Sequence, residues 1–185
     1  MVSRDGLTGN RLVLGVGTSP RREDYDVLGV DWASRGQRMD EEIAVLRGLA
    51  AGGHFSYHGK IFDLPPVKIA PVPSAPIPVL IGGHSNAALR RAARLGDGWL
   101  HGGRPGRTSR PARPPRRAPR RAGTAGRPFE VHVILADAYT VDGVRRLATR
   151  GVTDVIVGFR WPYQAGPDPS RSSTKSTSCA GSPTP

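Results

Sequence analysis

The sequence has little cysteine and no long apolar run. Its one cysteine, Cys179, lies in a tail rich in Ser, Thr and Pro, which excludes a disulfide within the chain and argues against a cysteine-based zinc site. No apolar stretch approaches the roughly 18 residues of a transmembrane helix, and residues 1–10 lack the apolar segment of a signal peptide. We therefore expect a cytoplasmic protein with no membrane partner.

Acidic side chains are missing from residues 104–127, a segment with nine arginines and five prolines. It supplies +9 of the formal net charge of +12. Because it has no apolar residue larger than alanine, it cannot form a packed core, and we expect it to be disordered. Residues 164–185, rich in Gly, Pro, Ser and Thr, are expected to form a disordered tail.

Two interpretations of the Arg/Pro-rich segment stay open. It could be an arm that binds RNA or DNA phosphates non-specifically, although no aromatic side chain is interleaved for base stacking. It could instead be GC-rich coding sequence read in a shifted frame, which yields Arg, Pro, Ala and Gly. We favour the shifted frame, because hydrophobic periodicity is lost at residue 104 and returns at residue 128. A nucleic-acid partner is then not expected.

The clearest pattern covers residues 76–100. A short apolar run at 77–81 is typical of a buried strand. Two glycines follow, and then a helical pattern with alanines and leucines on one face and arginines on the other. Gly96 is expected to end this helix, and a second strand begins at Asp97. Such a βαβ unit implies a parallel sheet covered by helices.

The turn of this unit contains Gly82, Gly83 and Ser85. Two glycines allow the backbone to approach a bound group closely, and the N–H groups of a helix start favour a phosphate. Ser85 or Asn86 can cap the helix, and Ser85 adds a hydroxyl donor. The alternative is that the glycines only make a tight turn.

Further elements are expected on both sides of the unit. His54 and His58 fall in a β-like region rather than on one face of a helix, so we expect no metal site. Strands are expected near residues 11–19, 129–135 and 152–159, a hairpin at 55–64 turning at Gly59-Lys60, and helices at 23–28, at 34–50 with a capping box at Ser34–Gln37, and at 140–150 capped by Thr140.

A family resemblance extends over residues 11–103 and 128–163. It is carried by Arg11–Gly17, Tyr25, Leu28–Val30, Arg38–Glu41, Phe55–Lys60 and, above all, Ile81–Ser85 with Asp97–Trp99. Together these segments resemble luciferase-like flavin or deazaflavin monooxygenases and oxidoreductases, most of all the deazaflavin-dependent branch.

The resemblance implies an α/β fold, a partial (β/α)8 TIM barrel with the cofactor at the C-terminal ends of its strands. Glycines and a serine at the turn would hold the cofactor phosphate, residues after the first strand would line the pocket, and two residues would sit at the next strand end. The cofactor-binding residues that it implies are Gly82, Gly83, Ser85, Thr18, Glu23, Gly98 and Trp99. Trp99 could instead be a core aromatic.

The implied chemistry is hydride transfer between a bound deazaflavin, coenzyme F420, and a small organic substrate, catalysed by a dehydrogenase or monooxygenase. FMN is the alternative cofactor, and full-length members of the family can form homodimers. The sequence assigns no catalytic acid or base. Two other functions stay open: a nucleic-acid-binding protein acting through the Arg/Pro-rich arm, and an inactive gene remnant.

The expected organisation departs from a whole barrel, which has about 250 residues. We expect five barrel strands and an N-terminal truncation that removes the first three or so strands of the family pattern. Residues 1–103 would be the central part of the barrel, 104–127 the Arg/Pro-rich segment, 128–163 the last strands and 164–185 the tail.

Overall fold

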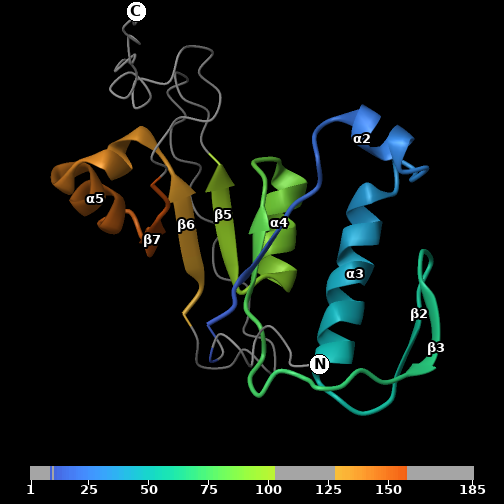
Figure 1. The fold of residues 1–185 in the computed structure, drawn as a ribbon. Helices are drawn as coiled ribbons and strands as arrows, with labels where there is room; N and C mark the ends of the chain where they lie inside the picture. Colours follow the sequence, from blue (N-terminus) through green and yellow to red (C-terminus); the bar gives the residue numbers. More distant parts are fainter. Residues whose placement is uncertain (1–8, 10, 103–127, 158–185) are drawn as a thin grey trace, which may run out of the picture.

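The computed structural model describes residue 9, residues 11–102 and residues 128–157. Within them, five parallel strands form one sheet in the order β1-β4-β5-β6-β7, and β2 and β3 form a separate antiparallel hairpin (Figure 1). The strands are Leu14–Val16 (β1), Phe55–His58 (β2), Asp63–Val67 (β3), Val79–Gly82 (β4), Gly98–Gly102 (β5), Glu130–Ile134 (β6) and Asp154–Val155 (β7). The helices are Arg22–Val27 (α2), Arg35–Ala50 (α3), Asn86–Leu95 (α4), Val141–Ala148 (α5) and the short 3-10 helix Ala136–Tyr139 (η1).

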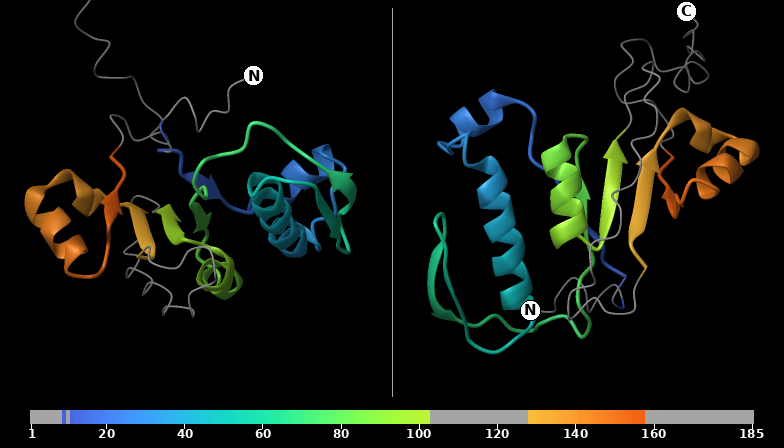
Figure 2. Two further views of the ribbon diagram at one scale, coloured as in Figure 1. Left: turned by 90° about the horizontal axis from the view of Figure 1, so that it is seen from below. Right: turned by 180° about the vertical axis from the view of Figure 1, so that it is seen from behind.

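Helices connect the parallel strands, as the βαβ pattern predicts. Helix α4 joins β4 to β5, and η1 with α5 joins β6 to β7. Seen along the strands, α3, α4 and α5 lie around the outside of a curved row of strands (Figure 2). All five expected barrel strands and the hairpin are confirmed. The Arg/Pro-rich segment and the tail lie outside the described residues, so the domain boundaries stay predictions.

Different side chains project from the two faces of the parallel sheet. On the face toward the helices, Ile81, Trp99 and Val131 are neighbours in register and are buried. Because side chains alternate along a strand, Leu100 and His132, which are also register partners, lie on the opposite face. The other buried members of the core are Met39, Ile43, Val79, Ala92, Leu95, Val133, Ala138 and Leu147.

Side-chain caps fix the starts of two helices. Ser85 Oγ accepts a hydrogen bond from the Ala88 N–H at 3.1 Å, and Thr140 Oγ1 accepts one from the Gly143 N–H at 3.1 Å. Each bond satisfies a backbone donor that has no acceptor within its own helix. The cap expected at Thr140 is confirmed, and of the two candidates Ser85 and Asn86 it is Ser85 that caps α4.

Gly96 ends α4 for a different reason from the expected one. Its φ of −87° is extended backbone rather than the left-handed region. A Cβ at this position would instead lie 2.8 Å from the carbonyl oxygens of both Ala92 and Gly98. Lack of space for a side chain therefore favours glycine here.

The capping box predicted at Ser34 is wrong. Ser34 makes no side-chain cap bond to the helix, and its hydroxyl donates back to the Asp31 carbonyl oxygen at 3.1 Å. The Asp31 carboxylate accepts from the N–H groups of Ala33 at 3.0 Å and Ser34 at 2.8 Å. Asp31 therefore closes the turn that precedes α3, and the Ser34 side chain does not cap the helix itself.

Ionic contacts join the helix layer to the sheet. Arg47 of α3 donates to the buried carboxylate of Asp97 at 2.8 Å, and the same carboxylate oxygen accepts from the Val79 N–H at 2.9 Å. Asp40 of α3 pairs with Arg91 of α4. These pairs link residues about 50 positions apart in sequence.

Among the described residues, no helix has the length and apolar character to cross a membrane.

Glu41 anchors the tip of the hairpin to α3. Its side chain is 7% exposed, and its carboxylate accepts from the N–H groups of Ile61 at 2.9 Å, Phe62 at 3.1 Å and Lys60 at 3.1 Å, and from the Gln37 amide at 3.0 Å. Burial acts to raise the pKa of Glu41, but these donors together outweigh it and lower the pKa. The carboxylate is therefore the acceptor that closes the β2–β3 turn.

Protonation of Glu41 is expected to loosen the hairpin in acid. Because the folded pKa of Glu41 lies below its ordinary value of 4.5, its contribution to stability is complete above that value and is lost as pH falls through the lowered pKa. The stability difference between wild type and Glu41→Gln, measured by urea unfolding from pH 7 to pH 2, should therefore shrink in acid. Glu42→Gln, an exposed neighbour on the same helix, is the control. A difference between wild type and Glu41→Gln that stays constant with pH would contradict this role.

Candidate functional site: the glycine turn after β4

The two glycines of the turn after β4 have little space for a side chain. Gly83 has a φ of +119°, and a Cβ there would lie 2.8 Å from the Ala88 Cβ. A Cβ on Gly82 would lie 3.4 Å from the Val16 carbonyl oxygen of the neighbouring strand. An L-residue at Gly83 would be strained in backbone and crowded in side chain. The two glycines thus keep the end of β4 close to β1 and to the first turn of α4.

The start of α4 suits an anion. Ser85 is exposed and caps the helix, and its hydroxyl proton can still be donated. The N–H groups of Asn86 and Ala87 belong to the first turn, where a helix provides no acceptor of its own. No acidic residue occupies that turn. Donors and helix dipole therefore favour a phosphate at this place.

Trp99 supports the turn from within the core. It is 2% exposed, and its Nε1–H donates to the Gly83 carbonyl oxygen at 2.9 Å. The expectation that Gly98 and Trp99 sit at a strand end on the cofactor side needs correction. Strand β5 begins at Gly98 and ends at Gly102, and the Trp99 ring lies on the helix side of the sheet. Trp99 is a core aromatic that orients the turn.

Gly98 is a packing residue in this structure. It pairs in register with Leu80, two positions before the end of β4. A Cβ at Gly98 would lie 2.3 Å from Leu80 Cδ2 and 2.6 Å from the Glu130 carbonyl oxygen. Its missing side chain thus lets β4, β5 and β6 approach one another, and it is not brought to the turn.

Thr18 and Glu23 follow β1 and are placed differently. Thr18 lines a cavity of about 610 Å³ between the end of β1, α2 and the start of α3. Its neighbour Gly17 lies beside Gly82, whose Cα would be 3.9 Å from a Cβ built on Gly17. Glu23 is exposed in the first turn of α2 and does not line the cavity. The structure therefore brings Thr18, but not Glu23, toward the glycine turn.

The rings of His84, Trp99 and His101 form a cluster next to the turn that was not predicted from the sequence. The His101 ring centroid lies 4.5 Å from that of His84 and 5.2 Å from that of Trp99. His101 is 3% exposed, and burial, aided by the nearby His84, lowers its pKa. A neutral His101 packs as an aromatic ring rather than supplying a cation. The alternation of Trp99 and His101 along one strand was the available signal.

Comparison with known proteins identifies the family. A family model described as luciferase-like monooxygenase matches residues 3–170. The chain belongs to the luciferase-like monooxygenase family. The matched range includes the Arg/Pro-rich segment, whose reading frame stays a prediction.

Individual relatives of this luciferase-like chain agree with the assignment. An uncharacterized protein of Mycobacterium tuberculosis is 54% identical over 170 residues, which cover 91% of this chain and 58% of that protein. An F420-dependent glucose-6-phosphate dehydrogenase of Microbacterium testaceum is 33% identical over 93 residues, 49% of this chain and 27% of that protein. The chain thus spans 58% of the length of the first of these relatives.

A solved structure supports the fold of this luciferase-like chain. The monooxygenase RslO1 from Streptomyces bottropensis superposes with a TM-score of 0.54 at 17% identity, covering 79% of this chain and 48% of that one. At this identity the likeness concerns the fold alone. Together with the family match, it confirms the partial α/β barrel expected from the sequence.

Proposed function

We propose that the glycine turn holds the phosphate of a flavin-type cofactor in an oxidoreductase of the luciferase-like family. The observation that carries the proposal is the juxtaposition of Gly83, which has no space for a side chain, with a serine-capped helix start that contains no acid. The backbone at Gly82 and Gly83, the Ser85 hydroxyl and the first N–H groups of α4 would bind the phosphate. These donors can bind an anion, and no acidic side chain in the first turn of α4 repels it.

The cofactor we propose is coenzyme F420, with FMN as the alternative. The F420-dependent glucose-6-phosphate dehydrogenase of Microbacterium testaceum, which matches about half of this chain, supports the deazaflavin. When bound, such a cofactor exchanges a hydride with a small organic substrate, and the protein positions it and excludes water. In this chain Trp99 would fix the turn and Thr18 would flank it, while a contact from Glu23 stays a prediction.

Two substitutions at Ser85 test the phosphate assignment. Ser85→Ala should weaken binding of coenzyme F420 or FMN to the full chain by about 5- to 30-fold, or about 1–2 kcal/mol, because one hydrogen bond to a charged group is lost. Ser85→Asp keeps a good helix cap but places a carboxylate at the phosphate, and should weaken binding more. Isothermal titration calorimetry measures both.

A control separates this effect from a general loss of folding. Ser56→Ala changes an exposed serine on β2 and should leave the affinity unchanged. If wild type binds neither cofactor, the proposed function is wrong. If Ser85→Asp binds as tightly as wild type, Ser85 is a helix cap only and the phosphate lies elsewhere.

A further inference from the structure

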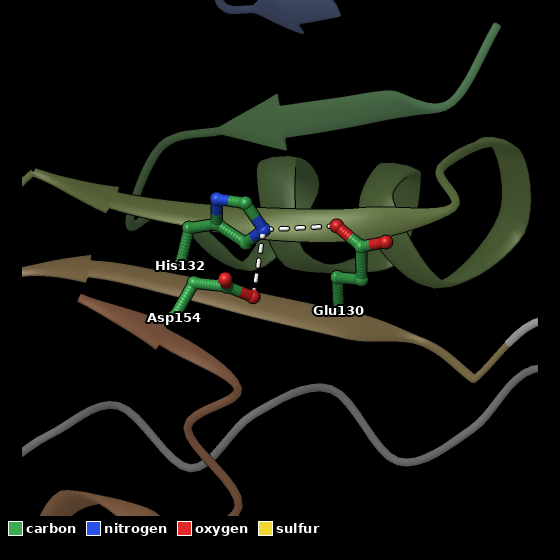
Figure 3. A group of neighbouring side chains, drawn as sticks. All are labelled: Glu130, His132 and Asp154. Atoms are coloured by element: carbon green, nitrogen blue, oxygen red, sulfur yellow. Dashed lines mark hydrogen bonds and ion pairs between the residues drawn. The ribbon is translucent and has the colours of Figure 1, made fainter. Parts of the chain in front are cut away.

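Three potential metal ligands meet on the face of the sheet that points away from the helices. Glu130 and His132 are two positions apart on β6, so their side chains project to the same face. Asp154 on β7 is the register partner of His132. Figure 3 shows the three side chains converging across the two strands. They are separate from the glycine turn, which follows β4.

The distances within this cluster suit a bound cation. His132 Nε2 lies 2.9 Å from Glu130 Oε2 and 3.2 Å from Asp154 Oδ2. The three ligand atoms all lie within 4.8 Å of one another. A metal ion with ligands at about 2.0–2.2 Å separates neighbouring ligands by about 2.8–3.1 Å in octahedral geometry and about 3.3–3.6 Å in tetrahedral geometry. Small side-chain adjustments would therefore bring one nitrogen and two oxygens onto a shared ion.

The charges of the cluster also favour a bound cation. In the described part of the chain, the ion pairs of Glu130 and Asp154 are both with His132. The two carboxylates converge on one imidazole nitrogen, and their like charges repel each other, so a cation bound between them would stabilise the cluster. The His132 side chain is only 17% exposed, whereas that of Asp154 is 52% exposed. The site is thus partly desolvated at the nitrogen and open to an ion arriving beside the aspartate.

We propose that Glu130, His132 and Asp154 bind a divalent transition-metal ion of the Zn²⁺ class, with water completing its coordination. A mixed set of one imidazole and two carboxylates suits such ions better than Mg²⁺ or Ca²⁺, which prefer oxygen ligands alone. The ion would link β7 to β6. Strand β7 has only two residues, and β6 is its partner in the described sheet. The role of the ion is to hold these strands together, independently of the cofactor proposed above.

Zinc titration of the full chain tests the proposal. All proteins carry Cys179→Ser, which removes the one thiol, and are stripped with a chelator. Calorimetry should show one Zn²⁺ bound per chain, with a rise in Tm as Zn²⁺ is added. His132→Gln and Glu130→Gln should each reduce the affinity at least tenfold and abolish the rise in Tm. Co²⁺ bound in place of Zn²⁺ should give visible absorption bands that His132→Gln removes.

The control is a histidine–carboxylate pair without a second carboxylate. His58 Nδ1 lies 2.6 Å from Asp63 Oδ1 on the exposed hairpin, and His58→Gln should leave Zn²⁺ affinity unchanged. Circular dichroism of the metal-free variants confirms that they fold. The proposal is overturned if the Cys179→Ser protein without further changes binds no Zn²⁺ at millimolar concentration. It is also overturned if adding His132→Gln leaves the Zn²⁺ affinity unchanged, or if His58→Gln reduces the affinity as much as His132→Gln does. In each case the cluster is an ion pair only.

Discussion

Gly83→Asp is expected to reduce the affinity for coenzyme F420 or FMN at least 100-fold, or by about 2.8 kcal/mol. Two causes add. The new Cβ would lie 2.8 Å from the Ala88 Cβ, in a backbone with φ of +119° that L-residues rarely adopt. The new carboxylate would stand beside the proposed phosphate and repel it. Calorimetric titration of both cofactors measures the loss.

Two further variants separate these causes. Gly83→Ala carries the backbone strain and the clash without the charge, so it should bind more tightly than Gly83→Asp. Gly151→Asp is the matched control, because Gly151 also has a positive φ, +85°, but has open space around it and follows α5. Gly151→Asp should bind as wild type does. Equal losses in Gly83→Ala and Gly83→Asp would show that no phosphate lies at the turn.

Trp99→Ala is expected to destabilise the fold by about 3–5 kcal/mol, the range for removing a large aromatic side chain from a core. Trp99 is 2% exposed and packs in the cluster with Ile81 and Val131. Since domains have a net stability of about 5–15 kcal/mol, the loss should lower Tm strongly. Urea unfolding followed by circular dichroism measures the free energy.

The link between Trp99 and the turn is tested by a smaller change. Trp99→Phe keeps most of the packing but removes the Nε1–H that donates to the Gly83 carbonyl oxygen. It should destabilise by about 1 kcal/mol and still weaken cofactor binding. Trp32→Ala, a partly exposed tryptophan near Arg35 and Tyr25, should cost less than half as much as Trp99→Ala. If Trp32→Ala and Trp99→Ala lowered the free energy of unfolding by similar amounts, the core would not be centred on Trp99.

The sequence was sufficient for the elements whose signals are local. The five barrel strands, the hairpin and the cap at Thr140 were predicted correctly, and the cap of α4 is one of the two residues that the sequence offered, Ser85. Apolar runs, periodicity and a cap all depend on residues within about four positions of one another, so they can be read without knowing what packs against them. The family resemblance was also carried by contiguous blocks, and the family match confirms it.

The tertiary structure decided what depends on register and on distant partners. Which face of β5 Trp99 occupies follows from the pairing of β5 with β4 and β6, and this places the ring in the core. The Glu41 contacts span 19 to 21 residues, and Asp154 meets His132 across two strands. Strand register is set by the burial of whole faces rather than by adjacent residues. A local pattern therefore contains no information about these contacts.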